Sequence, residues 1–331
     1  MKKLGIGKVV FFSCILTAGA LLGYSFSPSF LWLLLLTIPL GIGAGSVDTG
    51  LNNYVANNYS AMHMSWLHCF WGLGAFFGPN IMTFVLGNLG DWRKGYQVIG
   101  SLQFFIAFLL LVSLPLWKKS SNDTSESHHE KLTGLSLIRK KGVLLSILAF
   151  PIYVGVEAGI GLWFGSYLIE GLNFSQGRAG IIVSLFYLSL TIGRFLNGII
   201  SNKFSTKAII RGGIFIMILG LSVLILPFKT MTTLGIILAG LGCAPIFPSM
   251  IHQTPKLFGS SNSEEITGYQ VGMAYLAGLL ITPLIGLLAN RLFIGIIPIL
   301  YIFFTLLLFV ITERLNSVIG KGKKDLFSLE V

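Results

Sequence analysis

An aspartate and an asparagine stand four residues apart in one of the most apolar parts of this chain. Asp48 and Asn52 belong to the segment GIGAGSVDTGLNN, which follows a strongly apolar run over residues 31–40. On a helix, Gly41 and Gly45 share one stripe with this pair. A carboxylate in such surroundings is costly and usually faces a cavity or a partner. We interpret Asp48 as a residue that exchanges a proton or binds substrate hydroxyls, with Asn52 beside it. The alternatives are a hydrogen bond that orients the helix, or water access near a helix end.

A second carboxylate, Glu157, lies about midway along another apolar run. Tyr153 and Gly161 fall on the same helical stripe as Glu157, and Trp163 follows shortly after. An aromatic ring beside a polar acceptor suits a sugar, because the C–H face of the sugar packs on the ring while its hydroxyls find partners. We predict that Glu157 takes part in proton coupling and in substrate binding, together with Tyr153 and Trp163. Packing inside the span is the alternative.

Three further polar or aromatic side chains are candidates for the same substrate site. His68 and Trp71 lie in WLHCFWGLGAFFGP, where small and polar residues recur at helical spacing, and Gln270 opens a later apolar run. A single histidine inside such a run is more often a packed hydrogen-bonding group than a ligand. We expect His68, Trp71 and Gln270 to contact substrate, with packing as the competing interpretation for each.

The sequence offers little support for enzymatic or metal chemistry. No spacing of a nucleophile and a base, no metal motif and no phosphate-binding loop is recognisable. The pair His128-His129 has no third ligand at a useful spacing, and the three cysteines are scattered through apolar runs. An integral membrane enzyme therefore remains a weak alternative, and we expect no metal and no cofactor.

The composition indicates an all-α protein that crosses a membrane many times. Of 331 residues, 54% are hydrophobic and only 11% are charged, and the mean hydropathy is +0.82. Apolar runs long enough to cross a bilayer recur along the whole chain. We predict ten spans, at about 8–26, 31–55, 64–88, 95–117, 143–170, 179–201, 207–228, 231–255, 267–290 and 293–312. In the eighth span, Pro245 and Pro248 predict a helix break, and His252 follows them near the expected cytoplasmic end.

The basic residues predict the orientation of these spans. Alternate loops and both termini carry 17 of the lysines and arginines, whereas the opposite loops carry 5. Such a bias places both termini and the long central loop in the cytoplasm, in an inner or plasma membrane. The net charge of +11 is thereby explained by topology and by anionic lipid, without nucleic acid as a partner.

The long polar segment 118–142 divides the chain into four spans and six. We expect a helical bundle over 1–117, a cytoplasmic loop over 118–142, a six-helix bundle over 143–314 and a basic tail over 315–331. Both the first and the seventh span begin after a short basic turn, as repeated halves would. If the two parts are repeats, two spans are missing from the first part, upstream of Met1.

Four stretches resemble the major facilitator superfamily, and within it the fucose:proton symporter family. They are 193–198 (GRFLNG) followed by Asn202-Lys203, 48–52 (DTGLN), 153–161 (YVGVEAGIG) with Trp163, and 240–249 (GLGCAPIFPS). The resemblance implies a two-bundle fold that begins at the family's third helix, and alternating access to a central site. It also implies a gating contact for Arg194, which stands near the cytoplasmic end of its span, where arginine can snorkel to the surface.

The resemblance implies a secondary transporter that imports a small neutral solute, such as a hexose or deoxyhexose, together with protons. Two alternatives stay open. One is an exporter of a drug or metabolite with the same architecture, because fold alone does not decide the substrate. The other is a remnant without transport activity, which the unequal number of spans in the two parts would explain.

Overall fold

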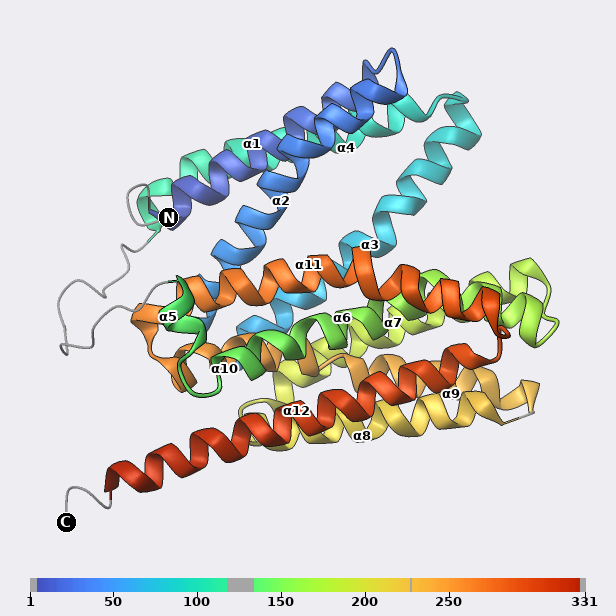
Figure 1. Ribbon diagram of the computed structural model, residues 1–331. Helices are drawn as coiled ribbons and strands as arrows, with labels where there is room; N and C mark the ends of the chain where they lie inside the picture. Colours follow the sequence, from blue (N-terminus) through green and yellow to red (C-terminus); the bar gives the residue numbers. More distant parts are fainter. Residues whose placement is uncertain (1–4, 118–133, 227, 328–331) are drawn as a thin grey trace. The chain divides into compact units, whose positions relative to one another are not determined.

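The computed structural model describes residues 5–117, 134–226 and 228–327, which form helices and, within these ranges, no strand. The helices are α1 (Ile6–Ser25), α2 (Phe30–Asn58), α3 (Ala61–Leu89), α4 (Trp92–Ser113), η1 (Leu114–Leu116), α5 (Gly134–Ile138), α6 (Val143–Ser166), η3 (Tyr167–Gly171), α7 (Gln176–Ile200), α8 (Thr206–Ile225), α9 (Lys229–Cys243), α10 (Ile246–Phe258), α11 (Ser260–Arg291) and α12 (Ile296–Phe327) (Figure 1). The predicted all-α fold is confirmed.

Nine segments in the described part of the chain are long and apolar enough to cross a membrane. The remaining predicted span, 64–88, forms α3, whose 29 residues also suffice for a bilayer. Large aliphatic and aromatic side chains on these helices are exposed, for example Leu279 at 72% and Phe215 at 69%. Because such side chains are stable in lipid rather than in water, the chain is an integral membrane protein.

The chain forms two compact units, and the boundary between them differs from the predicted one. The first unit comprises residues 1–54 and 73–130, and the second comprises 55–72 and 131–331. The adjoining ends of α2 and α3 therefore belong to the second unit, because their side chains pack into its core, as Met64 does at 0% exposure. Within the first unit α1 packs along α4.

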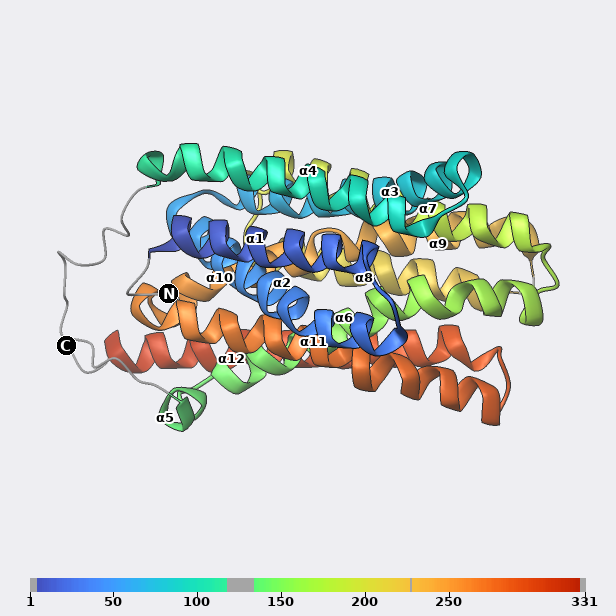
Figure 2. The same cartoon turned by 90° about the horizontal axis from the view of Figure 1, so that it is seen from above.

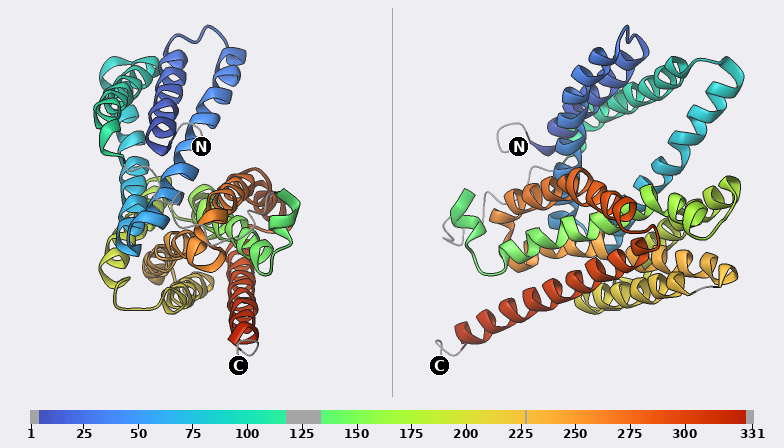
Figure 3. Two further views of the ribbon diagram at one scale, coloured as in Figure 1. Left: turned by 90° about the vertical axis from the view of Figure 1, so that its left-hand side faces the viewer. Right: turned by 45° about the vertical axis from the view of Figure 1, so that its right-hand side comes forward.

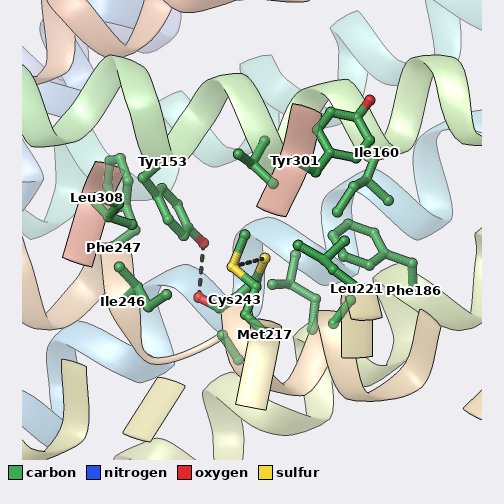
Figure 4. Close-up of a cluster of buried hydrophobic side chains, with 14 of the residues drawn as sticks. Tyr153, Ile160, Phe186, Met217, Leu221, Cys243, Ile246, Phe247, Tyr301 and Leu308 are labelled. Carbon is green, nitrogen blue, oxygen red and sulfur yellow. Dashed lines mark hydrogen bonds between the residues drawn. The ribbon is translucent and has the colours of Figure 1, made fainter. Parts of the chain in front are cut away.

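Helix α6 is the centre of the second unit. It packs against α11 and α12, which lie on either side of it in Figure 1; Figure 2 shows the same three helices from above. Thirteen of its residues are buried. Its apolar side chains belong to a core cluster that also includes Phe186 of α7 and Tyr301 of α12 (Figure 4). A helix that is apolar all around its circumference is suited to such a central place.

Helices α8 and α9 approach so closely that their backbones touch. A Cβ atom built on Gly220 would lie 2.7 Å from the carbonyl oxygen of Gly235, and one on Gly235 would lie 2.9 Å from that of Gly220. On the same two helices, a Cβ atom on Gly242 would lie 2.7 Å from the carbonyl oxygen of Gly213. Small residues of this kind permit the tight helix packing that stabilises membrane proteins.

The predicted break in the eighth span is confirmed: α9 ends at Cys243 and α10 begins at Ile246. Two other expectations need correction. The segment expected as a tail from residue 315 continues α12 to Phe327, and in Figure 3 this end extends past the neighbouring helices. The expected loop contains α5, whose Leu137 is fully buried against α6, α10, α11 and α12. His128-His129 lies outside the described residues.

Candidate functional site

A buried ion pair joins α6 to α7. Nη2 of Arg194 lies 2.9 Å from Oε1 of Glu157, and the two residues are 2% and 8% exposed. Glu157 is near the middle of α6, and Arg194 lies six residues before the end of α7. Burying two charges is expensive unless both are paired, so each residue depends on the other for its place in the core.

Helix α3 completes the surroundings of the arginine. Nη1 of Arg194 donates a hydrogen bond of 3.2 Å to the main-chain carbonyl of His68. The ring of Trp71, three residues further along α3, faces the guanidinium, whose central carbon lies 5.1 Å from the ring centre. Such cation–π contacts stabilise a desolvated arginine. The second unit therefore brings together Glu157, Arg194, His68 and Trp71, which were predicted separately.

The expectation that Arg194 snorkels to the membrane surface is wrong. Its side chain is only 3% exposed, because it turns inward to the carboxylate of Glu157. Among the described residues its Nε has no hydrogen-bond partner. Held beside a carboxylate and an aromatic ring, this N–H group can donate a hydrogen bond to a small polar solute once the helices around it open.

The imidazole of His68 packs in an aromatic cluster. Its ring lies edge-on to Phe247 of α10, with 4.9 Å between the ring centres. Phe150 also packs edge-on against Phe247, with 5.1 Å between the ring centres. Tyr153 is fully buried and donates a 2.8 Å hydrogen bond to the main-chain carbonyl of Cys243, as Figure 4 shows. This carbonyl stands at the break between α9 and α10, where helix geometry leaves carbonyls available.

Two other predicted substrate residues use their polar atoms in contacts between helices. Nε1 of Trp163 donates to the main-chain carbonyl of Thr282 over 2.7 Å. The side-chain amide of Gln270 donates to Ser146 over 2.7 Å, and its oxygen accepts from Thr254 over 3.1 Å. Gln270 thereby ties α11 to both α6 and α10.

We expect replacement of Gln270 with methionine to destabilise the protein by about 1 kcal/mol, because two hydrogen bonds between helices are lost. The midpoint of thermal unfolding in detergent measures this effect. Replacement of Tyr269 with phenylalanine is the control, since the bond that the hydroxyl of Tyr269 makes among the described residues is to Glu265 on the same helix. Unchanged stability combined with weaker solute binding would instead support Gln270 as a substrate residue.

The first unit contains the pair Asp48 and Asn52. Nδ2 of Asn52 donates a 2.7 Å hydrogen bond to Oδ1 of Asp48, one turn earlier on α2. Asn52 is fully buried, while Asp48 is partly exposed. Asp48 and Asn52 therefore lie on one face of α2 as predicted, and the side chain of Asp48 is only partly buried.

One polar contact of the second unit was not predicted from the sequence. Nδ2 of Asn197 donates to the hydroxyl of Ser65 over 2.7 Å, and both residues are buried. Asn197 follows Arg194 by three residues, so both side chains leave α7 on the same face. That spacing was the available signal for a polar contact with α3.

Comparisons with known proteins agree with this architecture. The sequence model described as "Major Facilitator Superfamily" matches residues 1–279 and, in a second match, residues 152–329. The glucose/mannose transporter GlcP of Bacillus subtilis is 24% identical over 280 residues, which are 78% of this chain and 66% of that protein. Bypass of stop codon protein 6 of Saccharomyces cerevisiae is 25% identical over 191 residues, 50% of this chain and 38% of that protein. The chain thus spans less than two thirds of either relative.

Solved structures share the fold at low sequence identity. The outward conformation of the transporter FucP, which is the fucose:proton symporter of E. coli, gives a TM-score of 0.77 at 16% identity, over 96% of this chain and 84% of that one. The proton:xylose symporter XylE gives 0.77 at 13% identity, over 92% and 79%. The human organic anion transporter MFSD10 gives 0.76 at 14% identity, over 93% and 77%.

Proposed function

Because the chain belongs to the Major Facilitator Superfamily, we propose that it is a secondary transporter that moves a hexose or deoxyhexose together with protons. The observation that carries this proposal is the buried ion pair of Glu157 and Arg194. Helix α3 contacts the arginine of this pair through the main-chain carbonyl of His68 and the ring of Trp71. Ionisable side chains within membrane spans are rare and mark proton or substrate pathways.

Proton uptake by Glu157 would remove the charge that attracts Arg194. The arginine keeps its own proton, so neutralising the carboxyl weakens the contact between α6 and α7. Because α3 is bonded to the same guanidinium through His68, the loosened pair also affects α3. We assign this change to the step in which access to the central site switches from one side of the membrane to the other. Asp48, bonded to Asn52, is the second carboxylate that we assign to proton exchange.

A sugar is the solute class that the site supports best. Trp71 is 53% exposed and can present a ring face to the C–H groups of a sugar, while Arg194 has an unused donor nearby. The Bacillus relative is named a glucose/mannose transporter, which supports the same class. The substrate-binding set that we propose is Asn52, His68, Trp71, Tyr153, Glu157, Trp163 and Gln270, with Arg194 as the gating residue.

The orientation is part of the proposal. The bias of basic residues supports cytoplasmic termini and insertion in the inner or plasma membrane. Import of sugar then carries protons from the outside to the cytoplasm.

Reconstituted liposomes that contain the full chain and an internal pH-sensitive dye test the function. Addition of glucose, mannose or fucose outside is expected to acidify the interior. Replacement of Asp48 with asparagine is expected to abolish this acidification, because no proton can be exchanged there, while the exchange of labelled for unlabelled sugar continues. Glu313→Gln is the matched control: it also removes a carboxylate, but one paired on an exposed surface with Arg211.

The same assay separates the alternatives. Acidification that persists in Asp48→Asn would remove Asp48 from the coupling step. An exporter would show no sugar-driven acidification, but it would move a drug or metabolite in the opposite direction. A remnant without transport activity would give neither proton flux nor sugar exchange.

A further inference from the structure

A polar seam joins the first part of α3 to α7 inside the second unit. Nδ2 of Asn197 donates a hydrogen bond of 2.7 Å to the hydroxyl of Ser65, and the two residues are 2% and 1% exposed. One turn earlier on α7, Arg194 donates to the main-chain carbonyl of His68 over 3.2 Å. Because positions three apart lie on one face of a helix, the same face of α7 makes both contacts.

The seam continues for one more turn in the same direction. Sγ of Cys69 donates to the main-chain carbonyl of Thr191 over 3.6 Å. A Cβ atom on Gly72 would collide with the hydroxyl of Thr191, so the helices come close here because Gly72 has no side chain. Over three successive turns, α3 and α7 therefore meet through polar groups and a small residue.

Three polar atoms along this seam have no hydrogen-bond partner among the described residues. They are Nε1 of Trp66, Nε of Arg194 and Oδ1 of Asn197. The indole of Trp66 stacks on Phe195 with 11° between the ring planes, and its Nε1 lies against Gly198, where a Cβ atom would collide with it. Burying a polar group without a partner costs free energy. The closed seam is therefore less stable than a seam in which every polar group is bonded.

The unpaired atoms can be satisfied when the two helices separate. Trp66 and Arg194 offer N–H donors, and the amide of Asn197 offers both a donor and an acceptor. A sugar that enters between α3 and α7 brings hydroxyl groups, each of which can donate and accept a hydrogen bond. The polar groups of the seam thus match a solute that reaches them in an open state.

We propose that α3 and α7 separate during transport and that Ser65 and Asn197 then bind the solute, in addition to the residues around Glu157. This inference rests on the proposed function, because only a transported solute passes between the helices. Proton uptake by Glu157 promotes the opening: Arg194 loses its carboxylate partner, and Arg194 is the middle contact of the seam. The separation then costs less, because the remaining contacts are few and incompletely bonded.

Reactivity of introduced thiols measures the opening. Ser65→Cys places a thiol in the seam, whereas Ser189→Cys places one on α7 where the side chain packs against Gly240 of α9. The two serines are 1% and 6% exposed. The full-length variants in nanodiscs are treated with N-ethylmaleimide, and peptide mass spectrometry identifies the modified positions. We expect the thiol at position 65 to react at least about tenfold faster than that at position 189, and its rate to change when glucose, mannose or fucose is added.

Sugar exchange in liposomes separates solute binding from packing. The double variant Ser65→Asn with Asn197→Ser exchanges the two side chains and keeps a hydrogen-bonding pair in the seam, so the unfolding midpoint should be retained. We expect the ratio of the half-saturation concentrations for glucose, mannose and fucose to change about tenfold, because the amide meets the solute from the opposite helix. Ser65→Ala, a smaller change, should raise these concentrations. Glu313→Gln, outside the seam, should preserve both the concentrations and their ratio.

The outcomes distinguish this inference from the proposed function. If the unmodified chain exchanges sugar, but the thiols at positions 65 and 189 react equally and slowly, the opening of the seam is overturned. Unaltered half-saturation concentrations in both seam variants would overturn solute binding by Ser65 and Asn197. If the unmodified chain exchanges no sugar, the proposed function fails, whereas faster reaction at position 65 would still support the opening.

Discussion

Replacing Glu157 with glutamine is expected to lower the free energy of unfolding by about 3–5 kcal/mol. The substitution preserves the shape of the side chain but leaves Arg194 with an uncompensated charge, and this residue is 2% exposed. Arginine cannot escape by losing its proton, whereas a buried carboxyl can be neutralised by gaining one. Unfolding of the purified chain in mixed detergent and dodecyl sulfate micelles provides the measurement.

A double-mutant cycle isolates the contribution of the ion pair. Arg194→Met is expected to be less damaging than Glu157→Gln, and the double variant should recover most of the lost stability, because no charge remains in the core. The exposed pair of Arg211 and Glu313, 47% and 27% accessible in its side chains, is the control. Glu313→Gln should change stability by about 1 kcal/mol or less. Additive effects of the two core substitutions would show that Glu157 and Arg194 are not coupled.

Replacing Gly220 with alanine is expected to destabilise the protein by about 1–3 kcal/mol or more, through overpacking. The new methyl group would meet main-chain atoms of α9, among them the carbonyl oxygen of Gly235 at 2.7 Å. Main-chain atoms cannot rotate away as the end of a side chain can, so α8 and α9 must separate. Their separation weakens the packing of two helices whose main chains are in contact.

Gly212 is the matched control on the same helix. Apart from its own turn of α8, no described part of the chain comes within 4 Å of a Cβ atom built there. Alanine at this position should stabilise the helix by up to about 1 kcal/mol, because alanine has the higher helix propensity. Thermal unfolding midpoints of the two variants should therefore move in opposite directions. If Gly220→Ala were as stable as Gly212→Ala, the close contact between α8 and α9 would not exist in solution.

The sequence predicted the helices well because hydropathy is a local property. Each apolar run forms a helix, and the prolines near residue 245 end α9 where expected. The i, i+4 arrangement of Asp48 and Asn52 follows from helix geometry alone, and the structure confirms it with a hydrogen bond. The carboxyl of Glu157 was recognised for the same kind of reason, since its depth in an apolar run can be counted along the chain.

The partners of these residues could not be predicted in the same way. The distance of Arg194 from the next loop suggested snorkelling, but a carboxylate 37 positions earlier in the chain holds it in the core. Likewise, Gln270 resembles a cavity residue in sequence, and only the packing of three helices reveals that Ser146 and Thr254 occupy its amide. The boundary of the two units at 55–72 also depends on tertiary packing, which no periodicity along α2 and α3 reports.

The break between α9 and α10 has a mechanical consequence. Helix α9 is fixed to α8 through main-chain contacts, and the helix is interrupted at Ala244 and Pro245, so this span can bend between α9 and α10. A tilt of α10 about this point would shift Phe247 against the ring of His68 and, at the other end, move Phe258 against Leu137 of α5. Helix α10 would then connect the aromatic cluster beside the ion pair with the packing of α5. A change at one end and a change at the other would influence each other reciprocally, to the same extent in free energy.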